Sequence, residues 1–213
     1  DQANALIDAG VDLNVTDKDG RNALMIALVY GRPDQANALI RAGIGLNTRD
    51  KYGRNALIIA LVYDRLDQAN ALIDAGVDLN VTDKDGKTAL MIALVYGRLD
   101  QANALIDAGV DLNVRDKDGR NAFIIALVYG RLDQANALID AGVDLNVRDK
   151  DGRNALIIAL VYERLEIIKK IKETNSSFNL FLIIIGMTGE GLNIITQMDS
   201  FVEVITDIRD FMQ

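Results

Sequence analysis

Aspartates recur along the chain in a fixed setting, Asp-Lys-Asp-Gly, and carboxylate-rich loops of this kind can bind Ca²⁺. The first of these segments spans 17–20. An EF-hand with Gly20 at its sixth position would need an acidic residue where Val15 stands and Glu where Ile26 stands. Because both of these residues are apolar, the sequence predicts tight turns rather than calcium loops. We expect Asp17 and its equivalents to accept hydrogen bonds from backbone N–H groups within their turns.

Chemistry that depends on histidine or cysteine is excluded, since the 213-residue sequence contains neither. The exclusion covers a Ser-His-Asp triad, a cysteine nucleophile, a histidine general base, a Cys/His zinc site and a disulfide framework. The glycine-rich stretch 186–191 follows a predicted helix and lacks a Walker lysine, so we do not expect a phosphate loop there. We therefore predict no catalytic residues, no cofactor and no metal, and we do not expect an enzyme.

Composition and charge narrow the class of protein further. Half of the residues are hydrophobic, which favours a folded chain, and the net charge of −8 argues against a nucleic acid as partner. The apolar run 180–185 is far shorter than the roughly 20 residues of a membrane span, so no membrane association is expected. The sequence begins at Asp1 without Met or a signal segment, which indicates a piece of a longer protein. We expect a cytoplasmic location, with a nuclear protein or a secreted effector as alternatives.

The turns return at a fixed interval, which identifies internal repeats. The segment that begins at Asp17 begins again at Asp50, Asp83, Asp116 and Asp149, each 33 residues after the last. The predicted units are a half unit at 1–16, full units at 17–49, 50–82, 83–115 and 116–148, and a partial unit at 149–173. Residues 174–213 break the period, and we expect them to form a degenerate repeat and a final helix that together cap the array.

Each unit has the residue pattern of a turn, a helix, a second turn, a second helix and an extended arm. In the first full unit, Asn22 is a suitable N-cap for an apolar helix over 23–30. Pro33 suits the first position of the second helix, and Gly31 and Gly43 suit the helix ends. Because a single unit cannot bury its own apolar face, the units are expected to stack.

The third unit carries the residues that make the pattern recognisable as that of a known family. They are Asp83, Gly86, Thr88, Leu90, Ala93 and Gly97, then Leu105-Ile106, Gly109, Asp111 and Asn113. In this spacing the unit resembles the ankyrin repeat, and the resemblance covers residues 1–173. It implies an all-α ankyrin-repeat solenoid of stacked helix-turn-helix units with turn or β-hairpin-like connecting arms. It also implies a non-catalytic protein-protein interaction module that binds through its turn tips and concave face.

Several columns depart from the family pattern. Arg replaces the usual His at Arg32, Arg65, Arg98, Arg131 and Arg164, and Gln replaces an apolar residue at Gln35, Gln68, Gln101 and Gln134. The glycine between the two helices is replaced by Asp64 in the second full unit and by Glu163 in the last unit. The fold assignment is unaffected, but the packing of the second helix and the geometry of the turn between helices stay open.

Tyrosine and basic residues supply the predicted partner-binding surface. Five of the six tyrosines form one column, Tyr30, Tyr63, Tyr96, Tyr129 and Tyr162, and the sixth, Tyr52, lies in a turn. The basic members of the predicted site are Arg21, Arg54, Lys87, Arg120 and Arg153. The resemblance places these positions where ankyrin proteins contact partners, and Tyr and Arg are enriched at interface hot spots. The alternative is that the tyrosines pack between neighbouring first helices.

Charge is expected to differ between the two surfaces of the array. Basic residues concentrate at the turns and unit ends, although the turns also carry Asp19, Asp85, Asp118 and Asp151, whereas other aspartates begin and end the second helices. A tyrosine-lined, relatively basic surface suits an acidic segment of a partner protein. Two other interpretations remain: a targeting or substrate-recruiting ankyrin segment of a larger multidomain enzyme or effector, and an engineered repeat scaffold. The sequence gives no oligomeric state.

Overall fold

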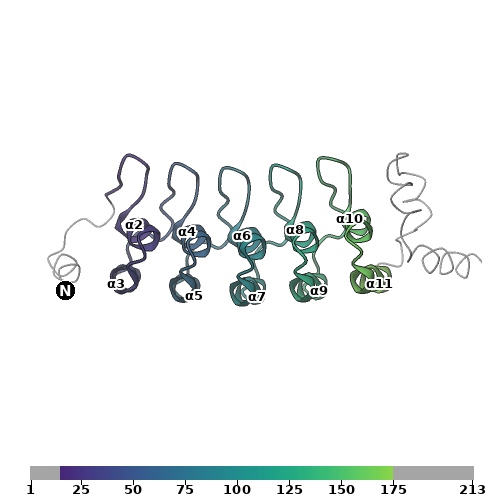
Figure 1. Ribbon diagram of the computed structural model, residues 1–213. Helices are drawn as coiled ribbons and strands as arrows, with labels where there is room; N and C mark the ends of the chain where they lie inside the picture. Colours follow the sequence, from purple (N-terminus) through teal and green to yellow (C-terminus); the bar gives the residue numbers. More distant parts are fainter. Residues whose placement is uncertain (1–14, 175–213) are drawn as a thin grey trace, which may run out of the picture.

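The computed structural model describes residues 15–174, which form stacked pairs of helices. The pairs are α2 (Ala23–Val29) with α3 (Pro33–Arg41), α4 (Ala56–Val62) with α5 (Leu66–Asp74), α6 (Ala89–Tyr96) with α7 (Leu99–Asp107), α8 (Ala122–Val128) with α9 (Leu132–Asp140), and α10 (Ala155–Val161) with α11 (Leu165–Thr174). Figure 1 shows the first helices in one row, the second helices in a row beneath, and the turns projecting from one side. The predicted all-α solenoid is confirmed.

The first helices form the centre of the core because they are apolar along their whole length. In α4 every residue from Ala56 to Leu61 is buried, and Phe123 in α8 is also fully buried. Such a helix needs neighbours on several sides, and the preceding repeat, the following repeat and its own second helix provide them. The hydrophobic core is therefore continuous from one repeat to the next.

A buried polar residue begins each first helix, as predicted for Asn22. In α8, the Asn121 Oδ1 accepts a hydrogen bond from the backbone N–H of Ile124 at 3.1 Å, and its Nδ2 donates to the carbonyl of Asp144 at 3.0 Å. In α6, Thr88 takes this place, and its hydroxyl accepts from the N–H of Met91 at 3.3 Å. The side chain thus caps the helix, and Asn22, Asn55 and Asn121 also fix the arm that follows the second helix.

Replacing Asn121 with Ala is expected to lower the free energy of unfolding by about 1.5 kcal/mol, because the buried N–H of Ile124 and the carbonyl of Asp144 lose their partner. Asn121→Thr keeps the cap, as Thr88 does, and should cost less. Urea unfolding followed by circular dichroism measures both variants. If the Ala and Thr variants unfold at the same urea concentration, the capping hydrogen bond contributes nothing.

The second helices are amphipathic and carry one buried apolar stripe, which in α5 includes Ala69 and Leu72. Pro33 stands at the start of α3, as predicted, where its missing N–H leaves no hydrogen bond unmade. The glutamines that depart from the family pattern are buried at Gln68, Gln101 and Gln134. The Nε2 of Gln68 donates to Asn37 Oδ1 of the preceding repeat at 3.2 Å, so this column joins neighbouring second helices.

The turn between the two helices of a pair requires a left-handed backbone. Gly31, Gly97 and Gly130 have φ of 64°, 70° and 67° at this position. The residues that replace glycine keep the same conformation, with φ of 61° at Asp64 and 55° at Glu163. The geometry of this turn is thus preserved, although Asp64 and Glu163 must adopt a left-handed backbone conformation that is unfavourable for L-residues with a Cβ.

Replacing Glu163 with Gly is therefore expected to raise the free energy of unfolding by roughly 0.5–1 kcal/mol, after allowing for the greater freedom of glycine in the unfolded chain. Asp64→Gly should gain less, because the carboxylate of Asp64 pairs with Arg98 at 2.8 Å. Thermal unfolding of both variants tests the expectation, and a lower melting temperature for Glu163→Gly would contradict it.

Backbone hydrogen bonds join each projecting turn to the next. The N–H of Lys51 donates to the carbonyl of Asp19 at 2.7 Å, and the N–H of Lys84 donates to the carbonyl of Tyr52 at 2.8 Å. The same bond continues from Lys117 to Asp85 and from Lys150 to Asp118, at 2.9 and 2.7 Å. The connecting arms are hairpin-like, with antiparallel bridges between Thr82 and Thr88 and between Arg148 and Asn154.

Two of the segments expected from the sequence lie almost entirely outside the described residues 15–174. The half unit at 1–16 is described only at its last two residues, and the degenerate repeat and capping helix at 174–213 only at Thr174. Within residues 15–174, no helix has the length and apolar character needed to cross a membrane.

Candidate protein-binding surface

The tyrosine column lies along the row of first helices. Four of the tyrosines are C-caps of α2, α4, α8 and α10, and Tyr96 is the last residue of α6. Their exposed fractions are 65% for Tyr30, 37% for Tyr63, 47% for Tyr96, 44% for Tyr129 and 41% for Tyr162. Residues in the preceding turn of the same helices, such as Leu61 and Leu94, are fully buried. Each tyrosine therefore offers a substantial part of its side chain to solvent.

Three tyrosines of the column, Tyr30, Tyr129 and Tyr162, interact electrostatically with the arginine of the turn that precedes their helix. The pKa of Arg21 is raised, first by its hydrogen bond with Asp17 and more weakly by Tyr30. In the last unit the pKa of Arg153 is raised first by its hydrogen bond with Asp149 and more weakly by Tyr162. Helical side chains lean toward the N-terminal end of their helix, which carries the phenol back toward the turn that precedes that helix. The structure thus brings together the two residue types of the predicted site.

The arginines of that site are held by carboxylates of their own turns. In the second turn, Asp50 Oδ2 accepts from Arg54 Nε at 2.9 Å and from its Nη2 at 2.7 Å. The side chain of Asp50 is only 1% exposed. Its Oδ1 accepts from the N–H groups of Tyr52 and Arg54, which confirms the predicted role of the turn aspartates. Because the buried Asp50 carboxylate compensates the guanidinium charge, Arg54 is also part of the turn's own structure.

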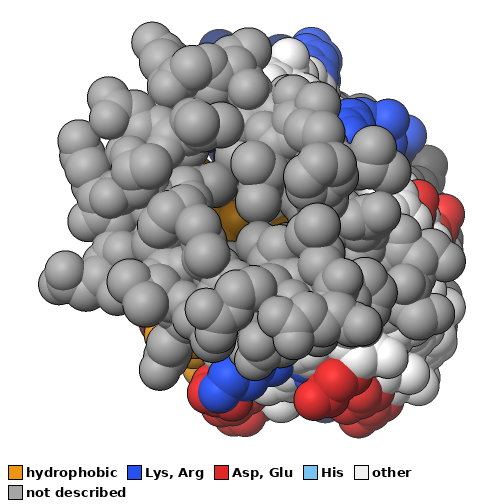
Figure 2. Space-filling view, turned by 90° about the vertical axis from the view of Figure 1, so that its right-hand side faces the viewer, with side chains coloured by type: hydrophobic (Ala, Val, Ile, Leu, Met, Phe, Trp, Pro, Cys, Tyr) orange, Lys and Arg blue, Asp and Glu red, His pale blue; other side chains and the backbone are white. Residues whose placement is uncertain are grey.

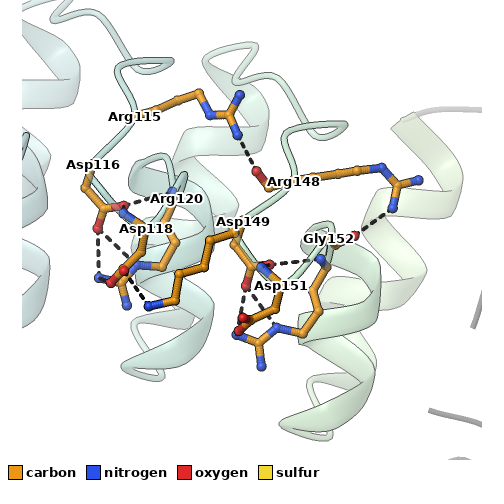
Figure 3. A network of polar contacts seen from close by, with 10 residues as sticks. Arg115, Asp116, Asp118, Arg120, Arg148, Asp149, Asp151 and Gly152 are labelled. Carbon is orange, nitrogen blue, oxygen red and sulfur yellow. Dashed lines mark hydrogen bonds and ion pairs between the residues drawn. The ribbon is translucent and has the colours of Figure 1, made fainter. Parts of the chain in front are cut away.

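The same arrangement recurs in the other turns that carry arginine, with a second carboxylate nearby. Arg120 lies 2.8 Å from Asp116 and 3.0 Å from Asp118, and Arg153 lies 2.8 Å from both Asp149 and Asp151. Figure 3 shows Arg120 beside Asp116 and Asp118. Arg21 lies 2.8 Å from Asp17 and 3.4 Å from Asp19. In the third turn, Lys87 replaces the arginine, and its backbone N–H donates to Asp83 at 2.9 Å.

Arginines at the unit ends bond to backbone carbonyls instead of carboxylates. Arg49 Nε donates to the carbonyl of Gly53 at 3.0 Å, and its Nη2 donates to the carbonyl of Thr82 in the next unit. Arg115 bonds in the same way to Gly119 and Arg148, as Figure 3 shows for the contact with Arg148. Within residues 15–174, neither guanidinium has a carboxylate within 4.0 Å, so their charge is uncompensated by an ion pair.

The second helices carry the opposite charge. Their terminal aspartates are all exposed: Asp34, Asp67, Asp100 and Asp133 in the first turns, and Asp74, Asp107 and Asp140 at the last residues. Figure 2 looks along the array from one end. It shows Lys and Arg side chains at the upper right, Asp and Glu side chains at the right edge below them, and both kinds at the bottom. Among these acidic residues, Asp140 is paired with Lys170 at 2.8 Å.

The sequence did not predict two sets of side-chain hydrogen bonds that recur between neighbouring repeats. The first is the bond from Gln68 to Asn37, repeated from Gln101 to Asn70 and from Gln134 to Asn103, each at 3.2 Å. The second set of contacts is made by arginines at the position where the family usually has His. Arg65 Nε donates to the carbonyl of Leu28 in α2, and Arg131 Nε donates to the carbonyl of Leu94 in α6, both at 3.1 Å. The 33-residue recurrence of these residue types was the available signal, but the periodicity does not reveal their partners.

No group of three or more His, Cys, Asp or Glu side chains within the described residues is arranged to hold a metal ion. A cavity of about 370 Å³ lies between the starts of α3 and α5. It is lined by Gly31, Pro33, Asp64, Arg65, Leu66, Asp67 and Gln68. The glycine-rich stretch 186–191 lies outside the described residues.

Comparison with known proteins agrees with the architecture. A family model described as ankyrin repeats, three copies, matches residues 1–83 and 90–181. A search among curated proteins returned no match. The repeated helix pairs, the projecting turns and this match together show that the chain belongs to the ankyrin repeat family, whose members are generally protein-protein interaction modules and typically non-catalytic.

Proposed function

We propose that this array binds a partner protein through the tyrosine column and the neighbouring turns, without chemistry of its own. The observation that carries the proposal is the repeated exposure of large aromatic side chains. Tyr63, Tyr96 and Tyr129 are 37–47% exposed at successive positions on the same row of helices. Tyrosine combines a large apolar ring with a hydrogen-bonding hydroxyl and has little conformational entropy to lose, which suits it to an interface.

The proposed partner segment is acidic. Arg49, Arg115 and Arg148 at the unit ends are exposed, as are Lys18, Lys51, Lys84, Lys117 and Lys150 in the turns. The turns also carry the exposed aspartates Asp85 and Asp151, whereas the aspartates that begin and end the second helices are exposed throughout. Complementary charge would orient an acidic segment toward the turns and away from the second helices. The turn arginines contribute a positive edge, although their buried aspartate partners compensate much of their charge.

The proposal is tested by affinity capture with the whole chain and with a variant in which Tyr63, Tyr96 and Tyr129 are all changed to Ala. A partner that uses this surface is recovered by the parent and lost by the variant. A matched variant with Asp67, Asp100 and Asp133 changed to Asn alters the outer surface instead, and it should recover the same partner. The proposal would be contradicted if the Asp→Asn variant lost the partner while the Tyr→Ala variant still recovered it.

A further inference from the structure

The second turn differs in sequence from every other turn. The other four read Asp-Lys-Asp-Gly, and the second reads Asp50-Lys51-Tyr52-Gly53. Tyr52 is 50% exposed, so the ring takes the place of a surface carboxylate. Arg54 lies over this ring with its Cζ 4.9 Å from the centroid, and Lys51 Nζ lies 5.1 Å from it. Two cations therefore meet an accessible aromatic ring at this turn.

Because Tyr52 stands where the other turns have Asp, Arg54 has one carboxylate fewer beside it. The equivalent arginines in the first, fourth and fifth turns lie 3.4, 3.0 and 2.8 Å from a second aspartate, and Figure 3 shows Arg120 of the fourth turn with its two aspartates. Tyr52 occupies that aspartate's position, so within the described chain Arg54 keeps only the buried Asp50. Of the turn arginines, Arg54 is thus the one with the least surrounding negative charge.

The lysine of the following turn, Lys84, has no aspartate opposite it in the preceding turn, and like Lys117 it forms no ion pair within the described residues. Lys51 pairs with Asp19 of the turn before it at 3.1 Å, and Lys150 pairs with Asp118 at 2.7 Å. At this position Lys84 meets Tyr52, with its backbone N–H bonded to the Tyr52 carbonyl at 2.8 Å. Lys84 is exposed and forms no ion pair within residues 15–174. Its ammonium group is therefore available to an external anion.

Arg49 completes the cluster from the other side of the turn. Its guanidinium bonds to the carbonyls of Gly53 and Thr82, which fixes it beside both the second turn and the third turn. In the third turn, Asp83 accepts from the backbone N–H groups of Asp85 and Lys87, so its carboxylate is directed into its own turn, whereas the side chain of Asp85 is exposed. The second turn thus presents an exposed ring with Arg54 and Lys51 against it, and Arg49 and Lys84 are bonded to its backbone at Gly53 and Tyr52. Asp50 compensates the charge of Arg54, and Asp19 compensates that of Lys51.

We propose that Arg49, Tyr52, Arg54 and Lys84, the second-turn site, bind a carboxylate side chain of the acidic partner segment and so fix its register along the array. This inference rests on the proposed function and adds to it a single anchoring position. The repeats are otherwise nearly identical, so a partner would find equivalent contacts after a shift of one unit. A unique cationic and aromatic site at one turn removes that ambiguity, because only one alignment places the carboxylate there.

The test uses the whole isotope-labelled chain and a short poly-glutamate peptide, titrated at low salt and followed by the amide resonances of Gly53 and Lys84. Tyr52→Asp gives the second turn the sequence of the other four and should fold normally. It is expected to weaken binding by about tenfold, because a carboxylate returns to the site. Lys84→Gln should weaken binding by about threefold.

A charge-matched control separates a local site from the effect of net charge. Asn70→Asp adds the same charge at an exposed position on α5 and retains the oxygen that accepts from Gln101. It should bind the peptide like the parent. Equal weakening by Tyr52→Asp and Asn70→Asp, or no perturbation of Gly53 and Lys84 by the peptide, would overturn the second-turn site. That result would leave the proposed function standing if changes to Tyr63, Tyr96 and Tyr129 still abolish capture of a partner.

Discussion

Gly86→Val is expected to destabilise the array by about 3 kcal/mol, because the substitution combines backbone strain with a steric clash. Gly86 has a φ of 77°, which a β-branched residue adopts only with strain. A Cβ at this position would also lie 3.1 Å from the Cα of Asp116 and 3.2 Å from the carbonyl oxygen of Arg115. These are backbone atoms of the next turn, so they cannot move away without disturbing the bonds between turns.

Gly109→Val is the matched control for this prediction. Gly109 has a φ of 73°, but no atom of the described residues lies within 4 Å of the place where its Cβ would stand. The Gly109→Val variant should therefore lose only about 1–2 kcal/mol of its free energy of unfolding, from backbone strain alone. Urea unfolding monitored by circular dichroism gives both values. Equal losses for the two variants would mean that the close approach between neighbouring turns adds no stability.

The local features of the fold could be predicted because single residues determine them. Asn22 caps α2, Pro33 begins α3, and Gly20 and Gly43 adopt left-handed conformations, as their residue types indicated. The apolar first helix and the 33-residue period then required the units to stack. Each of these inferences depends on chemistry within one unit and on its repetition, both of which the sequence contains.

Contacts between units could not be predicted in the same way. Gln68 appeared only as a departure from an apolar position, whereas the fold places it against Asn37. The turn arginines were predicted to bind a partner, but the sequence could not show that Arg54 is held by a carboxylate as deeply buried as Asp50. A side chain's partner in the next repeat depends on the distance and angle between stacked units, which the period alone does not specify.

Tyr63, Tyr96 and Tyr129 are each replaced with Ala, and at least one of the three variants is expected to bind the partner more weakly by roughly 2 kcal/mol or more. This loss corresponds to about a 30-fold higher dissociation constant. These tyrosines occupy the middle of the column, and hot spots concentrate near the centre of an interface. Each is more than a third exposed, so truncation removes contact area from the surface as well as from the core.

Stability must be measured beside affinity, because tyrosines that only pack between first helices would behave differently. On the packing interpretation, truncation lowers the melting temperature and leaves the affinity of the folded protein unchanged. Asp67→Asn and Asp100→Asn provide controls on the exposed starts of α5 and α7. Both changes should leave partner affinity within about twofold of the parent, as expected for residues outside the interface.

The most direct test of the tyrosine surface is the dissociation constant of the captured partner for Tyr96→Ala, measured by isothermal titration at a temperature where circular dichroism shows the variant folded. A surface built on the tyrosine column predicts affinity about 30-fold weaker than that of the parent, with Asp100→Asn unchanged. Parent-like affinity in a Tyr96→Ala protein that melts early would contradict it and would assign the tyrosines to packing between the repeats.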